Sequence, residues 1–390
     1  MLNGILRRPV GVEGFPESAQ LHFDWRGTRN NRASFCRNTR LLVEGGEDAD
    51  DREGTSMVNG TATISSAVGA MILAIVAQPT YAANAGARCP AMVKPVTVIG
   101  GNRFYKKGTV EKDAALTAKN RASVRPVYDF QNQLSSLSDK YVQTGSAQFK
   151  TCADNLLLSW ARSNALSKFG SNAKAGDFQS NYVQQWAVAG LGLARLKLGP
   201  LKNKSDDQIV RRWLKNSALS VHSFHQKIKN HNNHYDWAVL AVGSVGYSTG
   251  DQSLIDLSKK MFDVAIDQIQ PGGFLPLELK RKERAASYHS VAAQPLALYQ
   301  LIKSRCGNDA TKPAKLTELI TLVKKLKVNP DIVRERAGAK QVPMGNQPWI
   351  NVWDTVNGQA SKEKPSASRY ISGTSQTLSK VLKEGCPAVS

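Results

Sequence analysis

Residues 183–198 read VQQWAVAGLGLARLKL, and this stretch shows the pattern that decides the fold class. Along the whole chain from about residue 110, apolar side chains recur mainly at helical spacings, and strict alternation is rare. This period indicates amphipathic or buried helices. The same pattern recurs in six further stretches, residues 155–161, 207–219, 237–247, 254–269, 285–304 and 315–326.

Clusters of Gly, Pro and Asn separate these stretches, at residues 198–201, 270–273 and 327–330. Such clusters mark turns, and signals for β-hairpins are scarce. The sequence therefore predicts an all-α chain of antiparallel helical hairpins, forming a single domain over residues 86–390. Hairpins of this kind curl into a helical toroid around a central groove or pack as a compact bundle, and the pattern favours the toroid.

The first 85 residues differ from the rest. The apolar run Ala67–Ala77 has the length of a signal-peptide core and is too short to span a membrane. Small residues follow it, with cleavage sites near residues 82–85, although Met57–Ser66 contains no Lys or Arg. Residues 57–85 are interpreted as a signal peptide. Residues 1–56 are interpreted as a mis-assigned extension of the reading frame or a disordered tail, and the protein is expected in the periplasm or medium.

The formal net charge is +21, from 52 Lys and Arg against 31 Asp and Glu. Residues 1–82 hold 8 basic and 9 acidic residues, so the remainder holds 44 and 22 and carries about +22. A strong positive charge predicts a polyanionic partner, such as nucleic acid, an anionic membrane or an acidic polysaccharide. No helix-turn-helix, zinc-finger or RNA-recognition signature occurs, and an export signal argues against nucleic acid. The expected partner is an anionic polysaccharide, bound by a monomer that is free of the membrane after signal cleavage.

Five cysteines occur in the chain, and Cys36 lies upstream of the predicted cleavage site. The four that remain are an even number, which predicts one or two disulfides in an oxidising compartment with the pairing open. They are Cys89, Cys152, Cys306 and Cys386. No C-x-x-C pair and no H-E-x-x-H motif occurs, so no metal site is predicted.

Residues 229–239, KNHNNHYDWAV, place polar side chains just before an apolar helix. Asn232 or Asn233 suits the N-cap position, and the free N–H groups of a helix start suit a carboxylate ligand. The alternative is a polar loop whose Asn caps the helix while its His is solvated.

Residues 272–289, GGFLPLELKRKERAASYH, form the second polar segment. If the segment is helical, Arg281, Arg284 and Tyr288 fall at i, i+3 and i+7 on one face. Two guanidinium groups beside a phenol make an anion pocket with a proton donor, and their field is expected to lower the Tyr pKa. The alternative is a solvated basic helix face with a half-buried Tyr. His222 and His225 are expected at the surface.

Together the two segments match what β-elimination on a uronate requires. The substrate carboxylate must be neutralised to make the C5 proton acidic, and Asn and Arg can do so. His or ionised Tyr can remove that proton, and Tyr can protonate the departing O4. No cofactor is required.

The pair Asn233-His234, with LPLELKRKERAASYHSVAAQPL at residues 275–296, resembles the alginate lyase family of periplasmic mannuronate lyases. The pattern from Glu278 to His289 is the more specific part, and the resemblance covers about residues 88–370. It implies an incomplete α/α toroid with a deep basic groove, and endolytic cleavage that leaves a 4,5-unsaturated uronate.

The resemblance implies four catalytic roles. Asn233 neutralises the substrate carboxylate, and His234 is the C5 base or a second neutralising group. Arg281 binds the carboxylate and tunes Tyr288, which is the general acid. Because C5–H and O4 leave from the same side in mannuronate, Tyr288 could serve both steps. Lys112 is the candidate lid lysine, with Lys106 and Lys107 as competitors. Other candidate substrate-binding residues are Arg284, Gln184, Trp186, Tyr235 and His289.

Other substrates and functions remain open. Asp236, directly after Tyr235, departs from the pattern and could alter a subsite. Mixed alginate, glucuronan and hyaluronan-like chains are alternatives to polymannuronate. An anionic-glycan-binding protein without activity is the alternative class. For the tryptophans, including Trp186, packing between helices is the competing interpretation.

Overall fold

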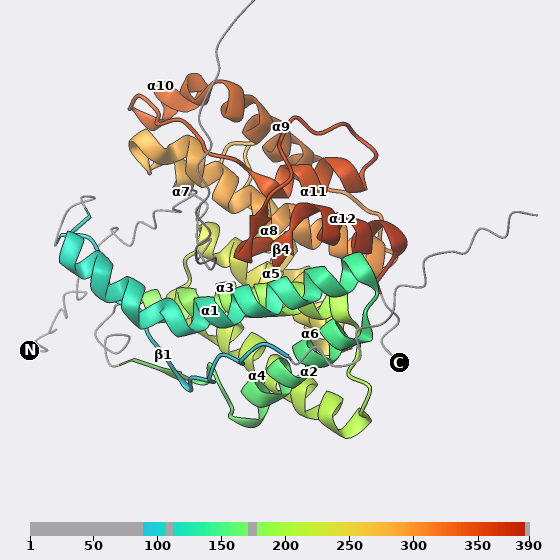
Figure 1. Cartoon of the computed structure of the whole chain (residues 1–390). Coiled ribbons are helices and arrows are strands. Elements are labelled where there is room, and N and C mark those ends of the chain that lie inside the picture. Colours follow the sequence, from blue (N-terminus) through green and yellow to red (C-terminus); the bar gives the residue numbers. More distant parts are fainter. Residues whose placement is uncertain (1–88, 107–111, 171–177, 387–390) are drawn as a thin grey trace, which may run out of the picture. The chain divides into compact units, whose positions relative to one another are not determined.

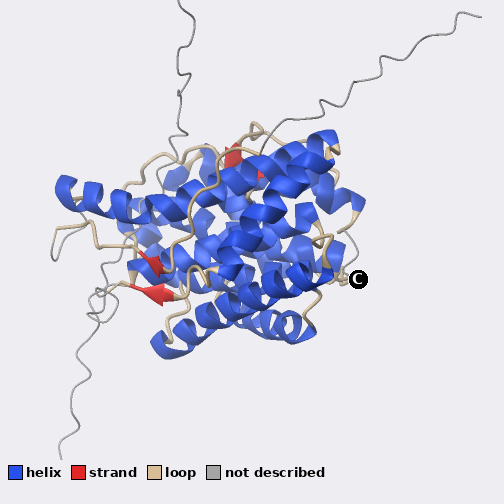
Figure 2. Ribbon diagram, turned by 60° about the horizontal axis from the view of Figure 1, so that its bottom comes forward, coloured by secondary structure: helices blue, strands red, loops and turns tan. Residues whose placement is uncertain are grey.

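The computed structural model describes residues 89–106, 112–170 and 178–386, which belong to one compact unit. The predicted signal peptide and the extension before it lie outside these residues. Helices make up almost all of the regular secondary structure in the described chain, with two short strand pairs (Figure 2). The all-α prediction is confirmed. No helix in this part of the chain is long and apolar enough to cross a membrane.

The first half of the described chain forms three long pairs of helices (Figure 1). These are α1 (Ala114–Thr144) with α2 (Ala147–Arg162), α3 (Gln179–Leu198) with α4 (Lys204–Ile228), and α5 (Asn233–Thr249) with α6 (Gln252–Asp267).

Shorter elements dominate the second half. They are α7 (Pro276–Leu279), the 3₁₀ turn η2 (Lys282–Arg284), α8 (Ala285–Cys306), α9 (Ala314–Val328), η3 (Pro330–Val333), α10 (Arg334–Ala337), α11 (Pro348–Val356), η4 (Arg369–Ile371) and α12 (Ser375–Glu384). Strand β1 (Val98–Ile99) pairs in parallel with β2 (Lys168–Phe169), and β3 (Ala367–Ser368) pairs antiparallel with β4 (Gly373–Thr374).

Helices α3, α5 and α8 form the centre of the unit, and α5 packs against both of the others. Every residue of α3 and of α5 is buried, which explains why apolar residues occur on all sides of both helices. Helices α4 and α6 cover them with one apolar face each and expose the other. Helical hairpins thus form an inner and an outer layer.

Close contact between the inner helices depends on glycine. A Cβ atom at Gly192 of α3 would overlap the side chain of Ser244 on α5, and one at Gly243 would overlap the ring of Tyr299 on α8. The helix backbones therefore approach more closely than larger residues would allow. This packing places the first turn of α5 beside α3 and α8.

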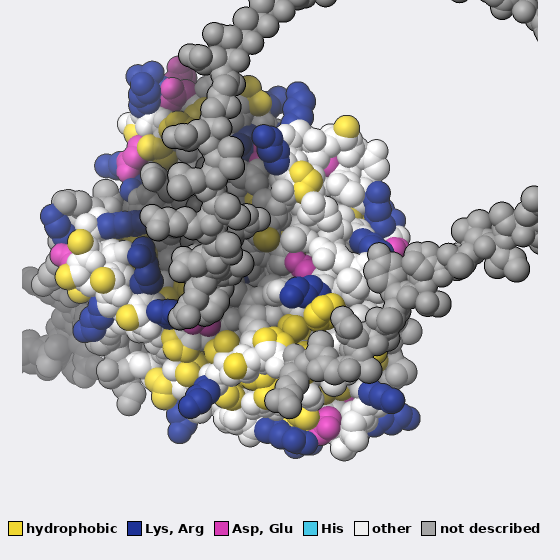
Figure 3. All heavy atoms as spheres, viewed as in Figure 1, with side chains coloured by type: hydrophobic (Ala, Val, Ile, Leu, Met, Phe, Trp, Pro, Cys, Tyr) yellow, Lys and Arg dark blue, Asp and Glu magenta, His cyan; other side chains and the backbone are white. Residues whose placement is uncertain are grey.

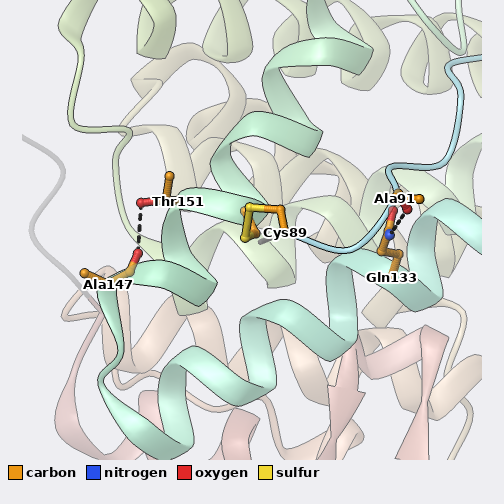
Figure 4. The surroundings of a disulfide bond; sticks show 6 residues. Cys89, Ala91, Gln133, Ala147 and Thr151 are labelled. Atoms are coloured by element: carbon orange, nitrogen blue, oxygen red, sulfur yellow. Dashed lines mark hydrogen bonds between the residues drawn. A yellow bond between two sulfur atoms is a disulfide. The ribbon is translucent and has the colours of Figure 1, made fainter. Parts of the chain in front are cut away.

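Two disulfides hold the ends of the described chain. Cys89 pairs with Cys152 and fastens the N-terminal segment to α2 (Figure 4), while Cys306 at the end of α8 pairs with Cys386. The predicted disulfides are confirmed, and the structure supplies the pairing. Next to Cys89, the Gln133 side chain of α1 donates to the Ala91 carbonyl at 2.7 Å (Figure 4).

A buried ion pair fastens the C-terminal segment. Lys197 of α3 is 2% exposed, and its Nζ lies 2.7 Å from Asp139 Oδ1 of α1. The same Nζ donates to the Ser372 carbonyl at 2.5 Å, and Asp139 Oδ2 accepts from Thr374 N at 2.7 Å. These bonds hold η4 and β4 against the inner helices.

Candidate functional site

The first turn of α5 carries two of the predicted site residues. Asn232 is the N-cap, and its side chain accepts from His234 N at 3.0 Å. Asn233 and His234 follow inside the helix and are only 1% and 2% exposed. The predicted helix start is confirmed, whereas the alternative of a solvated His is wrong because α3 covers this turn.

Glu278 of α7 holds Asn233 in place. Its Oε1 accepts from the Asn233 backbone N at 2.8 Å, and both carboxylate oxygens lie 3.1 Å from Asn233 Nδ2. Glu278 Oε2 also lies 3.4 Å from Arg281 Nε. One carboxylate therefore joins the two polar segments, and Asn233 Oδ1 has no hydrogen-bond partner among the described residues.

His234 is clamped between side chains of α3. Its ring stacks on Tyr182 with centroids 3.6 Å apart and planes 10° apart, and its Nδ1 lies 3.4 Å from Gln185 Nε2. Its Nε2 is buried and has no partner within the described part of the chain. Burial, and then the charges of Arg281 and His225, lower the pKa of His234 well below 6.5. The ring is therefore neutral at physiological pH.

Gln185 connects His234 to a second buried histidine. His225 Nε2 of α4 donates to Gln185 Oε1 at 2.7 Å, and His225 is 2% exposed. The prediction that His225 lies at the surface is wrong, because α4 turns this side chain inward against α3 and α5. Burial, followed by His231 and His222, lowers the pKa of His225 to about 3.

Residues 276–306 do not form the single helix on which the predicted arginine face depends. Helix α7, the turn η2 and helix α8 follow one another, and Lys282 between them has φ +50°. Arg281 and Arg284 thus precede α8, and Tyr288 lies in its first turn. The predicted contact survives, because the Arg281 guanidinium carbon lies 4.9 Å from the centre of the Tyr288 ring.

The predicted lowering of the Tyr288 pKa is wrong. Tyr288 is 3% exposed, and burial raises its pKa more than Arg281 and Arg284 lower it. Tyr105 and Glu278 add to the rise. Sequence alone cannot weigh burial against charge, since burial depends on what packs over the ring. Tyr288 is therefore a neutral phenol that holds a proton to donate.

The N-terminal segment reaches the same region. Tyr105 is close enough to Tyr288 to raise its pKa, and its backbone pairs with that of Lys112. Lys112 and Lys106 are exposed, whereas the competitor Lys107 lies outside the described residues. Arg284, beside Glu283, has a buried Nη1 without a partner in the described ranges.

The side chains of Gln184 and His289 form hydrogen bonds to other residues of the chain. The Gln184 amide donates to the Leu166 carbonyl at 2.8 Å and accepts from Ser220 at 3.2 Å. His289 Nδ1 donates to the Ala285 carbonyl at 2.7 Å, and its Nε2 accepts from Leu275 N at 3.0 Å. His289 is fully buried and anchors the chain before α7. For both residues, contact with substrate stays a prediction.

Trp186 and Tyr235 are also buried. The Trp186 ring is 2% exposed, 6.0 Å from that of His234, and lies between helices. Tyr235 is 5% exposed and lies 4.4 Å from the His231 ring, and burial raises its pKa to about 12. Packing accounts for both, and their substrate contacts stay predictions.

Several site residues carried no predicted role. Glu278 stood inside the specific pattern, and Gln185 stood beside Gln184, but α3 is buried on all sides and offers no periodic signal to separate the two. Arg369 and Tyr370 of η4 come from far along the chain, and the Tyr370 ring lies 6.2 Å from that of Trp186. Arg369 lies over Tyr128 at 4.1 Å and bonds to the Tyr370 hydroxyl at 3.1 Å.

Two buried carboxyl groups lie beneath the site. Asp236 is 3% exposed, and burial together with the charge of Glu278 raises its pKa well above 3.8. Both residues line a small pocket with His231 and Asn232. Within the described residues, no group of three or more His, Cys, Asp or Glu side chains is placed to hold a metal ion.

The surface agrees with the positive charge of the sequence. Lys and Arg side chains are spread over the face shown in Figure 3, with few acidic side chains between them. The site thus offers a guanidinium, open buried polar atoms and a phenol on a basic molecule. This set can neutralise a carboxylate and protonate a leaving oxygen.

Comparison with known families and sequences agrees with this chemistry. The model of the family described as alginate lyase matches residues 76–331. A polysaccharide lyase of Stenotrophomonas maltophilia (strain K279a) is 28% identical over 286 residues, which cover 72% of this chain and 86% of the relative.

Two relatives from Pseudomonas carry a more specific description. An alginate lyase of Pseudomonas syringae pv. tomato is 30% identical over 235 residues, 57% of this chain and 60% of its own length. An alginate lyase of Pseudomonas aeruginosa (strain LESB58) is 30% identical over 256 residues, 57% of this chain and 65% of its own. The chain thus spans less than two thirds of these two relatives.

Solved structures show the same fold. A variant of alginate lyase A1-III complexed with tetrasaccharide matches with a TM-score of 0.64 and 22% identity, over 74% of this chain and 85% of that one. Alginate lyase A1-III from Sphingomonas species A1 matches with a TM-score of 0.63, also at 22% identity, over 74% and 86%. This likeness confirms the α/α toroid over the compact bundle.

Proposed function

The chain belongs to the alginate lyase family, and on this premise we propose that it cleaves mannuronate-rich alginate at a site formed by Asn233, His234, Arg281 and Tyr288. Family membership makes it a polysaccharide lyase. The observation that carries the site assignment is the double role of Glu278, which bonds to both Asn233 and Arg281. A single carboxylate thereby sets the spacing of groups from two separate segments.

Neutralisation of the uronate carboxylate is the first requirement of the reaction. Arg281 supplies positive charge, and its side chain is largely buried, where a charge interacts more strongly than in water. Asn233 Oδ1 and His234 Nε2 are buried polar atoms that are open among the described residues. His234 Nε2, when it carries a proton, can donate to a carboxylate whose charge Arg281 balances. Asn233 Oδ1 only accepts, so it suits a substrate hydroxyl or a protonated carboxyl.

Proton transfer is the second requirement. The C5–H bond breaks, its electrons form the C4–C5 double bond, and the C4–O4 bond breaks as O4 takes up a proton. Tyr288 suits the last step, since burial keeps its phenol protonated. The C5 proton passes to His234, or to Tyr288 once its hydroxyl has lost its own proton. An ionised Tyr288 could then return the C5 proton to O4, because both groups leave mannuronate from one side.

Electrostatic attraction supports a polyanionic substrate. The chain carries +21, and Lys112, Arg284 and Arg281 are basic side chains on the segments that meet at the site. A neutral polysaccharide would gain nothing from this charge. The preference for mannuronate over other uronates rests on the family resemblance. Comparison of cleavage rates on several polyuronates tests it.

Export to the periplasm or medium is proposed with residues 57–85 as the signal peptide. Two disulfides support an oxidising compartment, since such bonds form and persist there. Mass determination of the exported protein tests this proposal, with a new N-terminus expected near residues 82–85. An exported protein that retained Met1 would contradict it.

A substrate panel tests the activity. The full chain is incubated with polymannuronate, mixed alginate, polyglucuronate and hyaluronan, with and without a chelator. We expect ultraviolet absorbance from the new C4–C5 double bond to rise fastest on polymannuronate, and product masses to show unsaturated uronates. Faster cleavage of polyglucuronate or hyaluronan would reassign the substrate. Tight polymer binding without any absorbance change would instead indicate a binding protein.

A further inference from the structure

We propose that Gln185 is a positioning residue that, together with His225, holds the His234 ring with its proton on Nε2, so that His234 acts as a hydrogen-bond donor. This inference rests on the proposed function and refines it, because a neutral His234 with its proton on Nε2 cannot take the C5 proton there. The C5 proton then passes to Tyr288 in its ionised form. No family resemblance assigned a role to Gln185 or His225.

The first step is the geometry of the bridge. Gln185 is fully buried on α3, and its amide lies between a histidine of α4 and a histidine of α5. Its Oε1 is 2.7 Å from His225 Nε2, and its Nε2 is 3.4 Å from His234 Nδ1. A carbonyl oxygen only accepts and an amide nitrogen only donates, so His225 Nε2 must carry hydrogen and His234 Nδ1 must accept.

The second step is the consequence for His234. A neutral imidazole carries one proton, and if Nδ1 accepts, that proton lies on Nε2. Stacking on Tyr182, with ring planes 10° apart, holds the ring in this orientation. His234 Nε2–H then has no partner among the described residues and is available to an anionic oxygen of the substrate.

The reversed amide would give the opposite tautomers, and the cost of unpaired groups decides against it. His225 Nδ1 has no partner among the described residues in either arrangement. With the amide as placed, this atom is an unpaired acceptor. Reversed, it would be a permanently buried and unpaired N–H donor, which is the rarer and costlier defect. The placed arrangement leaves its single unpaired N–H at the site, where substrate can satisfy it.

The groups around His234 keep the ring neutral. Arg281 and His225 are the charged or titratable groups that lower its pKa, after burial, and Tyr182 stacks on its face. A neutral donor beside the Arg281 guanidinium adds a second hydrogen bond to a carboxylate without adding a second buried charge.

Nuclear magnetic resonance tests the tautomer directly in the full chain with ¹⁵N-labelled histidine. Correlation of the ring nitrogens with the ring protons distinguishes Nδ1–H from Nε2–H, and His234→Gln assigns the signal. His289 is an internal reference of the opposite kind, since its Nδ1 must donate to the Ala285 carbonyl while its Nε2 accepts from Leu275. We expect His234 to be the Nε2–H form, and the Nδ1–H form would overturn the inference.

Kinetics of Gln185 variants give the second readout. Gln185→Leu is expected to lower kcat by up to about 10²- to 10³-fold, the cost of losing one preorganised donor, with a smaller change in KM. In Gln185→Glu, the carboxylate should place a proton on His234 Nδ1. His234 then keeps its Nε2–H only while its ring is cationic. Its activity should therefore fall as pH rises through the new pKa, a limb that the unmodified protein lacks.

A matched control separates positioning from packing. Gln300 is 3% exposed on α8 and donates to the Thr311 carbonyl at 3.0 Å, away from the site. Gln300→Leu should leave kcat and the His234 signal unchanged. If Gln185→Glu loses activity equally at every pH, the role of Gln185 is structural and the inference fails. Absence of lyase activity with an Nε2–H signal would overturn the proposed function and leave the tautomer standing.

Discussion

The Glu278 carboxylate accepts from both the backbone N–H and the side-chain amide of Asn233, 45 residues earlier in the chain. Glu278 is 1% exposed, so these bonds form away from water, where they are strong. The same carboxylate lies 3.4 Å from Arg281. The relative position of two proposed catalytic residues thus depends on a third that need not touch substrate.

Glu278→Gln tests whether the Glu278 carboxylate positions Asn233 and Arg281. An amide nitrogen would face the Asn233 amide, so charge-assisted bonds worth about 1.5–3 kcal/mol are lost. We expect kcat on alginate to fall by roughly 10- to 100-fold, since 1.4 kcal/mol corresponds to tenfold. The control is Glu318→Gln, because Glu318 accepts from Gly272 N at 2.7 Å on the exposed surface. Equal loss in both variants would contradict the role of Glu278.

Tyr288→Phe should abolish proton donation while the ring still packs. We expect turnover to fall by about 10²- to 10⁴-fold, the usual contribution of a general acid, with polymer binding retained. Steady-state absorbance and a binding assay measure the two effects. Tyr299→Phe is the matched control on the same helix, since its hydroxyl bonds to Ser258 at 3.1 Å within the helix packing. Full turnover in Tyr288→Phe would remove Tyr288 from the mechanism.

Stability should decrease in acid partly through His225. Its folded pKa is about 3, against 6.5 for the free side chain, so between these values the unfolded chain takes up a proton that the folded chain refuses. The stability that the neutral His225 contributes is complete above pH 6.5 and decreases as pH falls. The loss reaches about 2 to 3 kcal/mol at pH 4.5.

His225→Gln removes this titration, so chemical denaturation at pH 7 and pH 4.5 measures it. The unmodified protein should lose about 2 to 3 kcal/mol more than the variant between these two pH values. Asp236 acts in the opposite sense in both proteins, because its raised pKa favours the protonated folded state, and it cancels in the comparison. An equal loss in both proteins would show that His225 titrates normally.

Reduction of the disulfides should lower stability without changing the site. They close loops with sequence separations of 63 and 80, for which chain entropy predicts about 4 kcal/mol each. Thermal unfolding with and without a reductant, and of the Cys89→Ser and Cys306→Ser variants, measures the effect. We expect a lower Tm with unchanged kcat at temperatures where the chain stays folded. An unchanged Tm after confirmed reduction would contradict the prediction.

The sequence alone determined the features that depend on local pattern. Helical periodicity predicted the all-α class, Asn before an apolar run predicted that α5 starts at Asn232 or Asn233, and an even set of cysteines predicted disulfides. Arg281 and Tyr288 lie seven residues apart, so their contact was foreseeable even though the helix between them is broken. Short-range chain geometry is enough for each of these.

Tertiary structure decided everything that depends on what lies over a residue. Burial reversed the expected pKa shift of Tyr288 and turned His225 from a surface group into part of the site. Gln185 could not be told from Gln184, because a helix buried on all sides has no polar face to mark direction. Glu278 found its partner 45 residues away, and the disulfide pairing spans longer distances still. Local sequence encodes conformation, whereas desolvation and long-range partners arise only when the inner helices pack together.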